Sequence, residues 1–530
     1  MKTTTYPLTA PQTIRQQSAS LHAEDALQDL AAPALALVAE LCEALDRDGI
    51  RYCHWKSNNA LDRSASGDND LDLLVSRADE ARFTQVLSSL GFKRVKSPPE
   101  RQMPGVLDYL GFDPQAQKIV HVHAHYQLSL GDDLTKNYRL PVEEAYIDSS
   151  VQGNLFRVPA PEFELIVFVI RMVLKHASWD AMLFGYGRLK PGERRELTYL
   201  LERITPARVE ELVEQHLPAV GSALFERCLG TLRTTSSVWQ RISTGLRLQR
   251  ALSANALHPM VGDSLRKVWR RVYQAVRRRV RRSSPKFRPE NGGLIVALVG
   301  GDGAGKSTAI EATYDHFSRY FDVARFHMGK PSWSPVTFAV RAFLRAGRLL
   351  RLYPPESSFA ETLAQQSPVS PGYPWLAREV CRARDRYGTY VKARRHAARG
   401  GIVLLDRFPV SQLQLMDGPQ GERFVVHLAQ VEHASGLFRP RAASRLTGSM
   451  IRLEQGYYRR MSPPDLLLVL RVEPEVAVRR KTEEDPSQVL VRSTEVWEAD
   501  WDGTDATVID AGKSQEQVAA EVTSLIWAQL

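Results

Sequence analysis

The chain has 530 residues, more than one hydrophobic core normally organises, so two or three domains are expected. Hydrophobic residues make up 43% of it and charged residues 25%, values that are ordinary for a soluble globular protein. The net charge of +10 excludes a basic surface spread over the whole chain, because residues 266–288 alone hold eleven Lys or Arg and no acid.

The cysteine and hydrophobicity patterns predict a cytoplasmic protein. The four cysteines are scattered without CxxC or Cys/His spacing, which argues against both a disulfide framework and a zinc site. Residues 1–25 are polar and lack the apolar core of a secretory signal, so they predict a disordered tail. The most apolar stretch, Leu165–Leu174, is interrupted by Arg171 and predicts a buried helix rather than a membrane span.

Residues 26–150 alternate helical patterns with short apolar runs, such as Leu71–Val75 and Lys118–Val122, which predicts a small α+β domain. Asp70 and Asp72 stand two residues apart on the first of these predicted strands. Their carboxylates therefore point to the same face and can share a divalent metal ion.

Together with Lys56-Ser57 upstream, this Asp-Leu-Asp-Leu run resembles the polymerase-beta-like nucleotidyltransferase superfamily, whose hG[GS]…DhDh pattern has the same spacing. The resemblance implies that Asp70 and Asp72 hold Mg²⁺ for nucleotidyl transfer. In this chain Lys56 replaces the glycine, and His123 stands where the superfamily has a third carboxylate.

The run His121-Val122-His123-Ala124-His125 leaves the chemistry of this domain open. Because a neutral imidazole is a poor Mg²⁺ ligand, either the fold is degenerate or its metal chemistry is altered. Three histidines at alternate positions could form a transition-metal site. They could equally be ordinary histidines on a strand face, and DxD pairs are also common in solvated loops.

Residues 151–263 show apolar residues three and four apart and predict a helical connector, either a domain of its own or an extension of the first. Residues 264–291 then predict a basic amphipathic helix and a linker. Its apolar face consists of Leu265, Val268, Trp269, Val272, Tyr273, Val276 and Val280. Three roles remain open for residues 264–288: packing between domains by the apolar stripe, contact with an anionic membrane, or contact with nucleic acid.

Residues 292–530 predict a parallel sheet with flanking helices, with strands at 294–299, 402–405 and 466–472. The sequence GGDGAGKS directly follows the first strand, which is the context of a Walker A phosphate loop. Glycines let consecutive N–H groups face a phosphate, and the following helix adds the positive end of its dipole. The predicted ATP-binding residues are Gly300, Gly301, Asp302, Gly303, Ala304, Gly305, Lys306, Ser307 and Thr308.

A second motif ends the next strand of this domain with Asp406 and Arg407. Ligands bind at the carboxyl ends of parallel strands, so Asp406 is expected to hold Mg²⁺ together with Ser307, and Arg407 to grip a phosphate. Lys306 is expected to reach the β and γ phosphates of ATP. On its own, an Asp-Arg pair at a strand end is more often structural.

These motifs resemble the thymidylate kinase family of P-loop nucleoside monophosphate kinases, in order and spacing over about 235 residues. The matching elements are Gly300–Thr308 for GxDGxGKST, Asp406-Arg407-Phe408 with Ser411 for DRYxxS, Arg384-Asp385-Arg386 for the Ala-Asp-Arg helix, Pro464-Asp465-Leu466 for PDL, Pro474–Arg480 for PEVALxR and Val508–Ala511 for VIDA. The resemblance implies ATP and Mg²⁺ as cofactors and a dimer through helices of this domain.

By position, the resemblance implies that Asp302 meets the acceptor and that Arg386 and Arg407 bind its phosphate. Family members without an arginine inside the loop supply one from a lid. Since Gly303 occupies that loop position, the transition-state cation is expected from the lid, with Arg480 the first candidate by motif and Arg492 the second. Arg479 is a further candidate, and a plain surface arginine is the alternative for each.

The acceptor is the least constrained part of the prediction. Where the family carries a TREPGG-type segment, this chain reads Phe326–Pro331, and an insertion without family counterpart follows from about Ser332 to Tyr373. The expected function is transfer of the γ-phosphoryl group of ATP to a nucleoside monophosphate. The alternatives are a kinase or nucleotidyltransferase for a sugar, glycolipid or protein, and a non-catalytic ATP-gated regulatory module, peripheral at a membrane.

Overall fold

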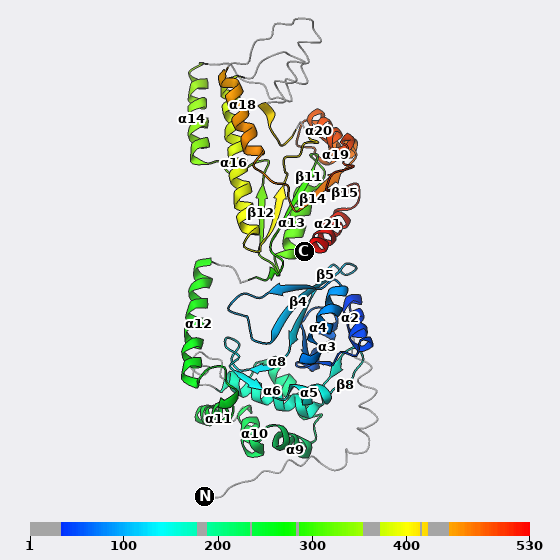
Figure 1. The fold of residues 1–530 in the computed structure, drawn as a ribbon, viewed down its shortest axis with the longest axis vertical. Coiled ribbons are helices and arrows are strands. Elements are labelled where there is room, and N and C mark those ends of the chain that lie inside the picture. Colours follow the sequence, from blue (N-terminus) through cyan, green and yellow to red (C-terminus); the bar gives the residue numbers. More distant parts are fainter. Residues whose placement is uncertain are drawn as a thin grey trace. The chain divides into compact units, whose positions relative to one another are not determined.

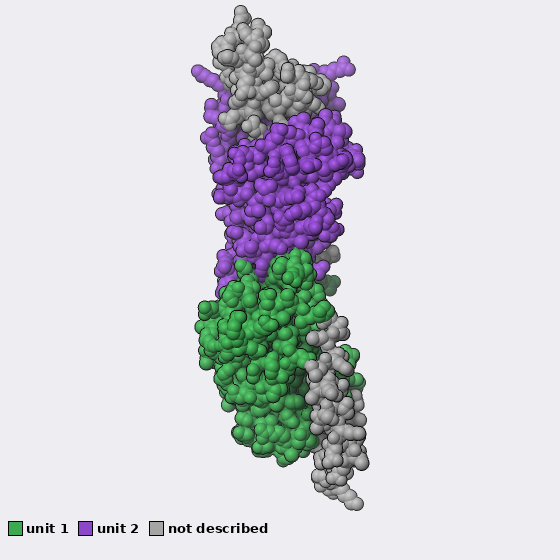
Figure 2. Space-filling model, turned by 90° about the vertical axis from the view of Figure 1, so that its right-hand side faces the viewer, with its two compact units in different colours: residues 1–285 green, residues 286–530 purple. Residues whose placement is uncertain are grey.

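The computed structural model describes residues 33–177, 188–233, 236–281, 286–352, 372–413, 416–421 and 445–530. The chain divides into two compact units, Met1–Pro285 and Lys286–Leu530, which Figure 2 colours separately. Both units mix helices and strands (Figure 1). In the described part of the chain, no helix is both long enough and apolar enough to cross a membrane. The predicted tail, residues 1–25, lies outside the described residues.

Unit 1, residues 1–285, has its strands in its first half. They are β1 (Tyr52–His54), β2 (Leu71–Val75), β3 (Lys93–Lys96), β4 (Val106–Asp113), β5 (Lys118–His125), β6 (Leu128–Leu130), β7 (Tyr138–Leu140), β8 (Val151–Gln152) and β9 (Arg157–Val158). The order in its main sheet is β1-β2-β5-β4-β3. β2 and β5 are parallel, and the other neighbours are antiparallel.

Helices cover this sheet and fill the second half of the unit. They are α2 (Ala36–Arg47), α3 (Leu61–Ala65), α4 (Glu80–Ser89), α5 (Glu143–Asp148), α6 (Pro161–His176), α8 (Pro191–Leu201), α9 (Pro206–His216), α10 (Gly221–Thr231), α11 (Val238–Ala251) and α12 (Met260–Arg281), with short 3-10 turns η3 (Asn58–Ala60), η4 (Arg77–Asp79) and η5 (Ser253–Asn255). α8, α9, α10 and α11 pack around α6. The buried residues of α6 share one core with Trp55 and Leu74 of the sheet region, so the helical segment extends the α+β part.

Strand alternation in β2 places three apolar residues on one face and Asp72, with the buried Leu74, on the other. Leu71, Leu73 and Val75 are buried with residues of α2 and α4. Asp72 therefore points to the opposite face, as the period of two along a strand requires. The polar residues of β2 and of neighbouring strands consequently gather on that face.

Unit 2, residues 286–530, has a five-stranded parallel sheet with the order β12-β13-β11-β14-β15. The strands are β11 (Leu294–Gly300), β12 (Val323–His327), β13 (Ile402–Asp406), β14 (Leu466–Arg471) and β15 (Ala506–Asp510), preceded by the short β10 (Arg288–Pro289). The predicted parallel sheet is thereby confirmed, and the mostly buried β11 lies at its centre.

The helices of unit 2 lie on both faces of this sheet (Figure 1). They are α13 (Lys306–Phe317), α14 (Pro335–Leu349), α16 (Tyr373–Ala397), α18 (Arg445–Tyr458), α19 (Pro474–Arg480), α20 (Pro486–Glu498) and α21 (Gln515–Gln529). Ile295 and Val403 share a core with Tyr390 of α16. α13 packs against α21, where the rings of Phe321 and Trp527 lie 6.5 Å apart. Helices on both sides leave the carboxyl edge of the sheet free to carry a site.

Candidate functional site

The glycine-rich loop of residues 300–305 connects the central strand β11 to α13. Gly303 and Gly305 both have φ +84°, a left-handed conformation that favours glycine. A Cβ atom on Gly303 would also lie 2.6 Å from the backbone oxygen of Ala477. The loop therefore delivers the first turn of α13, whose N–H groups have no intrahelical acceptor, to the carboxyl edge of the sheet.

Lys306 begins α13 and is buried inside this loop. Its ammonium donates hydrogen bonds to the backbone oxygens of Gly300 at 2.9 Å and Gly301 at 2.7 Å. Burial, reinforced by nearby Arg407 and opposed by Asp302, lowers the pKa of Lys306 to about 8. The charged form of Lys306 is therefore disfavoured by burial, and a bound anion would stabilise it.

Asp406 and Ser307 meet because β13 lies directly beside β11. Asp406 is in register with Leu298 at the end of the two strands. Its Oδ2 atom lies 3.3 Å from Oγ of Ser307. Its Oδ1 atom is buried and has no hydrogen-bond partner among the described residues. A buried carboxylate oxygen without a partner beside a hydroxyl is an oxygen-ligand set that suits a hard cation.

Asp302 is held by two arginines from distant elements. Arg407 follows β13 and pairs with Oδ1 of Asp302 at 2.7 Å, whereas Arg492 in α20 pairs with Oδ2 at 2.9 Å. Burial alone would raise the pKa of Asp302, but the two arginines outweigh it and lower that pKa. Arg407 takes a left-handed φ of +69°, an uncommon conformation that aims its side chain across the end of the sheet.

Arg386 is a buried cation on α16 that faces the same edge. It donates to the backbone oxygen of Met328 at 3.0 Å, to the hydroxyl of Tyr458 at 2.8 Å and to Asp417 at 2.6 Å. Asp417 also lies 3.7 Å from Arg407. The two arginines predicted to bind an acceptor phosphate are therefore brought together around one carboxylate.

A cavity of about 690 Å³ opens beside these groups. Seven cationic and five acidic side chains line it, and Lys330, Arg341, Arg378 and Arg382 join the arginines already named. Trp333 and Trp375 add two indole rings to the wall. The cavity is large enough for a small organic molecule and favours an anionic one with an apolar or ring-shaped part.

The sequence-based assignment of lid residues is only partly reflected in the geometry. Arg480 ends α19 and donates to the backbone oxygens of Ala511 at 2.7 Å and Gly512, beyond β15. Arg479 is exposed. Neither lines the cavity, whereas Arg492 does. Of the three arginines expected in a lid, Arg492, the second candidate by motif, is the one that lies beside the glycine-rich loop.

A second polar cluster lies in unit 1, where Asp72 is on β2 and Asp70 directly precedes this strand. Asp70 contacts His121 at 2.8 Å, and Asp72 contacts Lys56 at 2.8 Å and His123 at 3.1 Å. The two carboxylates thus have different partners.

The histidines of this cluster differ in charge. Burial opposes the charged form of His121, but hydrogen bonds with Asp108 and Asp70 outweigh it and raise its pKa to about 9. Burial lowers the pKa of His125 to about 3. His121 is therefore cationic near neutral pH and His125 is a neutral imidazole.

The comparisons with known proteins give no family. No protein-family model matches the chain, and no curated protein matches it. The chemistry of both clusters is therefore inferred from their own residues.

Sequence reasoning missed several cavity residues. Arg378 and Arg382 were missed, although they lie at four-residue steps before the predicted Arg386 on α16, a spacing that places the three cations on one helix face. Sequence reasoning also missed Asp108 of β4 in unit 1, which lies 2.8 Å from His121 of β5. The four-residue spacing of the arginines on α16 could have predicted that they share a helix face. Nothing in the sequence near Asp108 predicted that it would contact His121 of β5.

Proposed function

We propose that the chain is an ATP- and Mg²⁺-dependent phosphotransferase that moves the γ-phosphoryl group of ATP to a small anionic acceptor, with a nucleoside monophosphate as the first candidate. The observation that carries the proposal is the buried Lys306 inside a glycine-rich turn at the N-terminus of α13. That arrangement suits the β and γ phosphates of a nucleoside triphosphate. Asp406, at the end of the adjacent strand, adds a carboxylate beside this turn.

The residues around Asp406 fit a magnesium ion. The unpartnered Oδ1 of Asp406 and the Oγ of Ser307 are both hard oxygen ligands on the same side of the loop. Bound Mg²⁺ would neutralise charge on the phosphates. The protein's own part is to fix these two oxygens at the carboxyl edge of the sheet.

The arginines supply the remaining positive charge. Arg386 and Arg407 converge on Asp417, so an acceptor phosphate placed there can replace one carboxylate contact with a bidentate one. Arg492 reaches the loop at Asp302 and can stabilise charge that develops on the transferred phosphoryl group. These roles require hydrogen-bond donors that are positioned before the reaction begins. The ion pairs of the three arginines with Asp417 and Asp302 hold their side chains in place.

The cavity supports an acceptor that carries phosphate. Its walls hold more cationic than acidic side chains, and its two tryptophans can stack on a ring. A sugar phosphate or a glycolipid phosphate shares this chemistry with a nucleotide. The panel of acceptors in the experiment separates these classes.

The test is ATP consumption by the full chain with Mg²⁺, measured against thymidylate, other nucleoside monophosphates, sugars, sugar phosphates and glycolipid phosphates. Lys306→Ala should abolish acceptor-stimulated turnover, because the loop then lacks the cation that neutralises the transferred phosphoryl group. Lys513→Ala is the matched control, since Lys513 pairs with Glu521 at the surface. Full turnover in Lys306→Ala would refute the proposal, and ATP binding without stimulated turnover would favour the regulatory alternative.

We also propose that α12 places the protein on an anionic membrane surface. Part of its charged side faces the rest of unit 1: Arg271 pairs with Asp132 at 2.7 Å, and the ion pair of Lys267 with Asp263, both on α12, is buried. Its apolar residues are exposed instead, including Leu265, Trp269, Val272, Tyr273 and Val276. The side chain of Val280 lies outside the described residues.

An outward apolar stripe that carries Trp and Tyr, followed by a run of arginines in the sequence, has the composition of an interfacial helix. Nucleic acid would instead call for an outward basic face. Unit 1 by itself leaves this stripe uncovered, whereas the alternative of packing between domains would bury it.

A further inference from the structure

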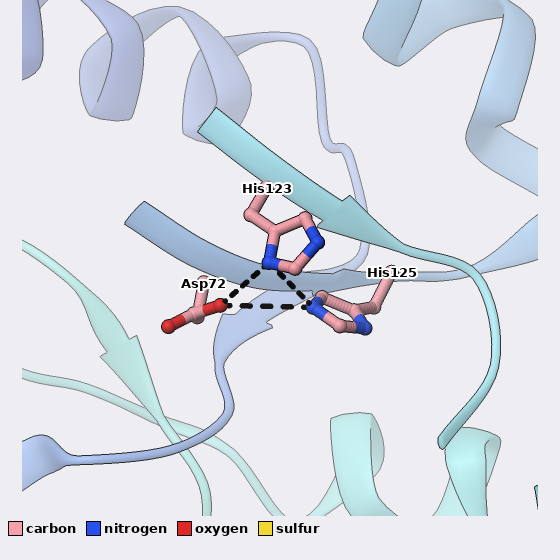
Figure 3. Close-up of side chains that lie close together, drawn as sticks. All are labelled: Asp72, His123 and His125. Carbon is pink, nitrogen blue, oxygen red and sulfur yellow. Dashed lines mark hydrogen bonds and ion pairs between the residues drawn. The ribbon is translucent and has the colours of Figure 1, made fainter. Parts of the chain in front are cut away.

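The polar face of the unit 1 sheet brings together residues from three neighbouring strands. In the strand register, Asp72 of β2 and Asp108 of β4 both lie opposite His123 of β5. His125 follows two residues later on the same face of β5. Figure 3 shows Asp72, His123 and His125 with their ligand atoms turned toward one another.

The three atoms are spaced as the ligands of one metal ion are. The Oδ1 atom of Asp72 lies 3.1 Å from Nδ1 of His123 and 3.6 Å from Nε2 of His125, and the two nitrogens lie 3.3 Å apart. In a tetrahedral zinc site with bonds of about 2.0–2.1 Å, neighbouring ligand atoms are about 3.3 Å apart. An ion therefore fits among these atoms without a large movement of the strands.

The donor set favours a transition metal over magnesium. Two imidazole nitrogens and one carboxylate oxygen suit Zn²⁺ or Co²⁺, whereas Mg²⁺ prefers oxygen ligands. His125 is buried, which fixes its ring, while His123 remains 29% exposed at its side chain. Solvent access at His123 leaves a path of entry and a fourth ligand position for water.

An outer carboxylate stands behind one of the imidazoles. Asp108 lies 3.9 Å from Nε2 of His123, on the side opposite Nδ1. Ligating histidines commonly direct their second nitrogen to a carboxylate, which orients the ring and strengthens the ligand. Asp108, whose Oδ1 atom also lies 2.8 Å from Nε2 of His121, would take that role only after moving about 1 Å closer to His123.

Lys56 is the feature that opposes a bound cation. Its ammonium lies 2.8 Å from Oδ1 of Asp72, the same oxygen that would bind the metal. It also lies 4.9 Å from the centre of the Trp55 ring, which offers the ammonium a second favourable contact. Lys56 and a metal ion therefore compete for one carboxylate oxygen.

We propose that Asp72, His123 and His125 form a site for a divalent transition metal of the Zn²⁺ class, with an open fourth position, and that Lys56 weakens metal binding by competing for Asp72. The site is independent of the phosphotransferase activity proposed for unit 2.

The test is titration of the metal-stripped full chain with Co²⁺, read by its visible absorption, followed by displacement with Zn²⁺. Excess Mg²⁺ is present throughout, so that an oxygen-ligand site such as the one near Asp406 does not contribute. We expect one Co²⁺ per chain with the intense bands of tetrahedral coordination. Zn²⁺ should bleach them, and Mg²⁺ should not.

Two matched pairs of variants locate the site. His123→Gln and Asp72→Asn should each weaken Co²⁺ binding at least a hundredfold, since loss of an outer-shell partner alone costs about 10- to 100-fold. His121→Gln on β5 and Asp70→Asn just before β2 change the same residue types outside the triad and should cost less than about tenfold. Lys56→Met should tighten binding at least about tenfold, because a positive charge beside the metal is removed.

Three outcomes would overturn the proposal or part of it. Equal Co²⁺ affinity in wild type and His123→Gln, with both proteins folded by circular dichroism, would remove the site. Equal losses in His121→Gln and His123→Gln would place the metal elsewhere on the strand. Unchanged affinity in Lys56→Met would refute the competition by Lys56 alone.

Discussion

Arg492 and Asp302 form a 2.9 Å ion pair although 190 residues separate them in the sequence. Arg492 lies in α20, and Asp302 lies in the loop between β11 and α13. Arg480, which the motif favoured, is bonded to the backbone beyond β15 instead. The two arginines therefore make different predictions.

Arg492→Ala should lower kcat of the proposed phosphotransfer by at least about a hundredfold, because it removes a preorganised donor to transition-state charge. Arg480→Ala should change kcat less than about fivefold and instead lower the melting temperature, since its guanidinium bonds two backbone oxygens. Steady-state kinetics and thermal unfolding of the two variants check this. A larger loss of kcat in Arg480→Ala would reverse the assignment.

Proton uptake should accompany ATP binding at alkaline pH. Burial lowers the pKa of Lys306 to about 8, so the free protein loses this charge as pH rises through 8. A bound phosphate favours the charged form and raises the pKa again. Uptake should therefore be near zero at pH 7 and approach one proton at pH 9.

Calorimetry in two buffers with different ionisation enthalpies measures this uptake. In Lys306→Arg it should vanish, since a guanidinium does not titrate in this range. Binding heats at pH 9 that are independent of the buffer in the wild type would contradict the role of Lys306.

Gly303 and Gly305 have the same φ of +84° but different surroundings. A Cβ atom on Gly303 would meet the backbone oxygen of Ala477 at 2.6 Å, whereas one on Gly305 would meet nothing within 4 Å. Alanine at either position costs about 1–2 kcal/mol of backbone strain. Gly303→Ala should lower the melting temperature clearly more than Gly305→Ala, and equal melting temperatures would argue against the packing of α19 on the loop.

The buried Glu164 should lower the free energy of unfolding of unit 1 as the pH rises. This buried residue of α6 accepts a hydrogen bond from the backbone N–H of Asn58 at 3.5 Å, and burial raises its pKa from 4.5 to about 7. Its folded pKa exceeds the unfolded value, so its contribution to stability is full below pH 4.5 and is lost as pH rises through 7.

Glu164→Gln should therefore match the wild type near pH 4.5 and exceed it by up to about 3 kcal/mol at pH 8. Thermal unfolding over this pH range measures the difference. Glu162→Gln, on the same helix but partly exposed, is the control variant. A difference that does not grow with pH would show that Glu164 is ionised at little cost.

Trp269 should drive membrane binding if α12 acts as proposed. Its side chain is 68% exposed on the apolar stripe. Trp269→Ala should weaken association with vesicles that contain anionic lipid at least about tenfold, since a large apolar side chain contributes about 1.5–3 kcal/mol when buried. Salt should weaken the binding further.

Trp239→Ala is the matched control, because Trp239 is 80% exposed on α11. Co-sedimentation with neutral and anionic vesicles measures the effect. Binding to duplex DNA or RNA without binding to vesicles would move α12 to the nucleic-acid interpretation.

Local features were predictable from the sequence because they depend on neighbouring residues. The strand before Gly300 is an unbroken apolar run, and Gly303 and Gly305 are required by left-handed backbone. The helix of residues 264–282 was likewise visible in its periodicity and is observed as Met260–Arg281. In each of these cases one short segment holds all the information.

Tertiary structure alone decided which of these segments meet. The neighbours of a strand depend on chain crossovers that periodicity does not encode, so only the sheet order places Asp72 and Asp108 beside His123. Helix packing likewise decided that Arg492 reaches the loop. Sequence by itself determined the chemical groups and their local conformations. Folding determined their partners, because the contacts join segments far apart in the chain.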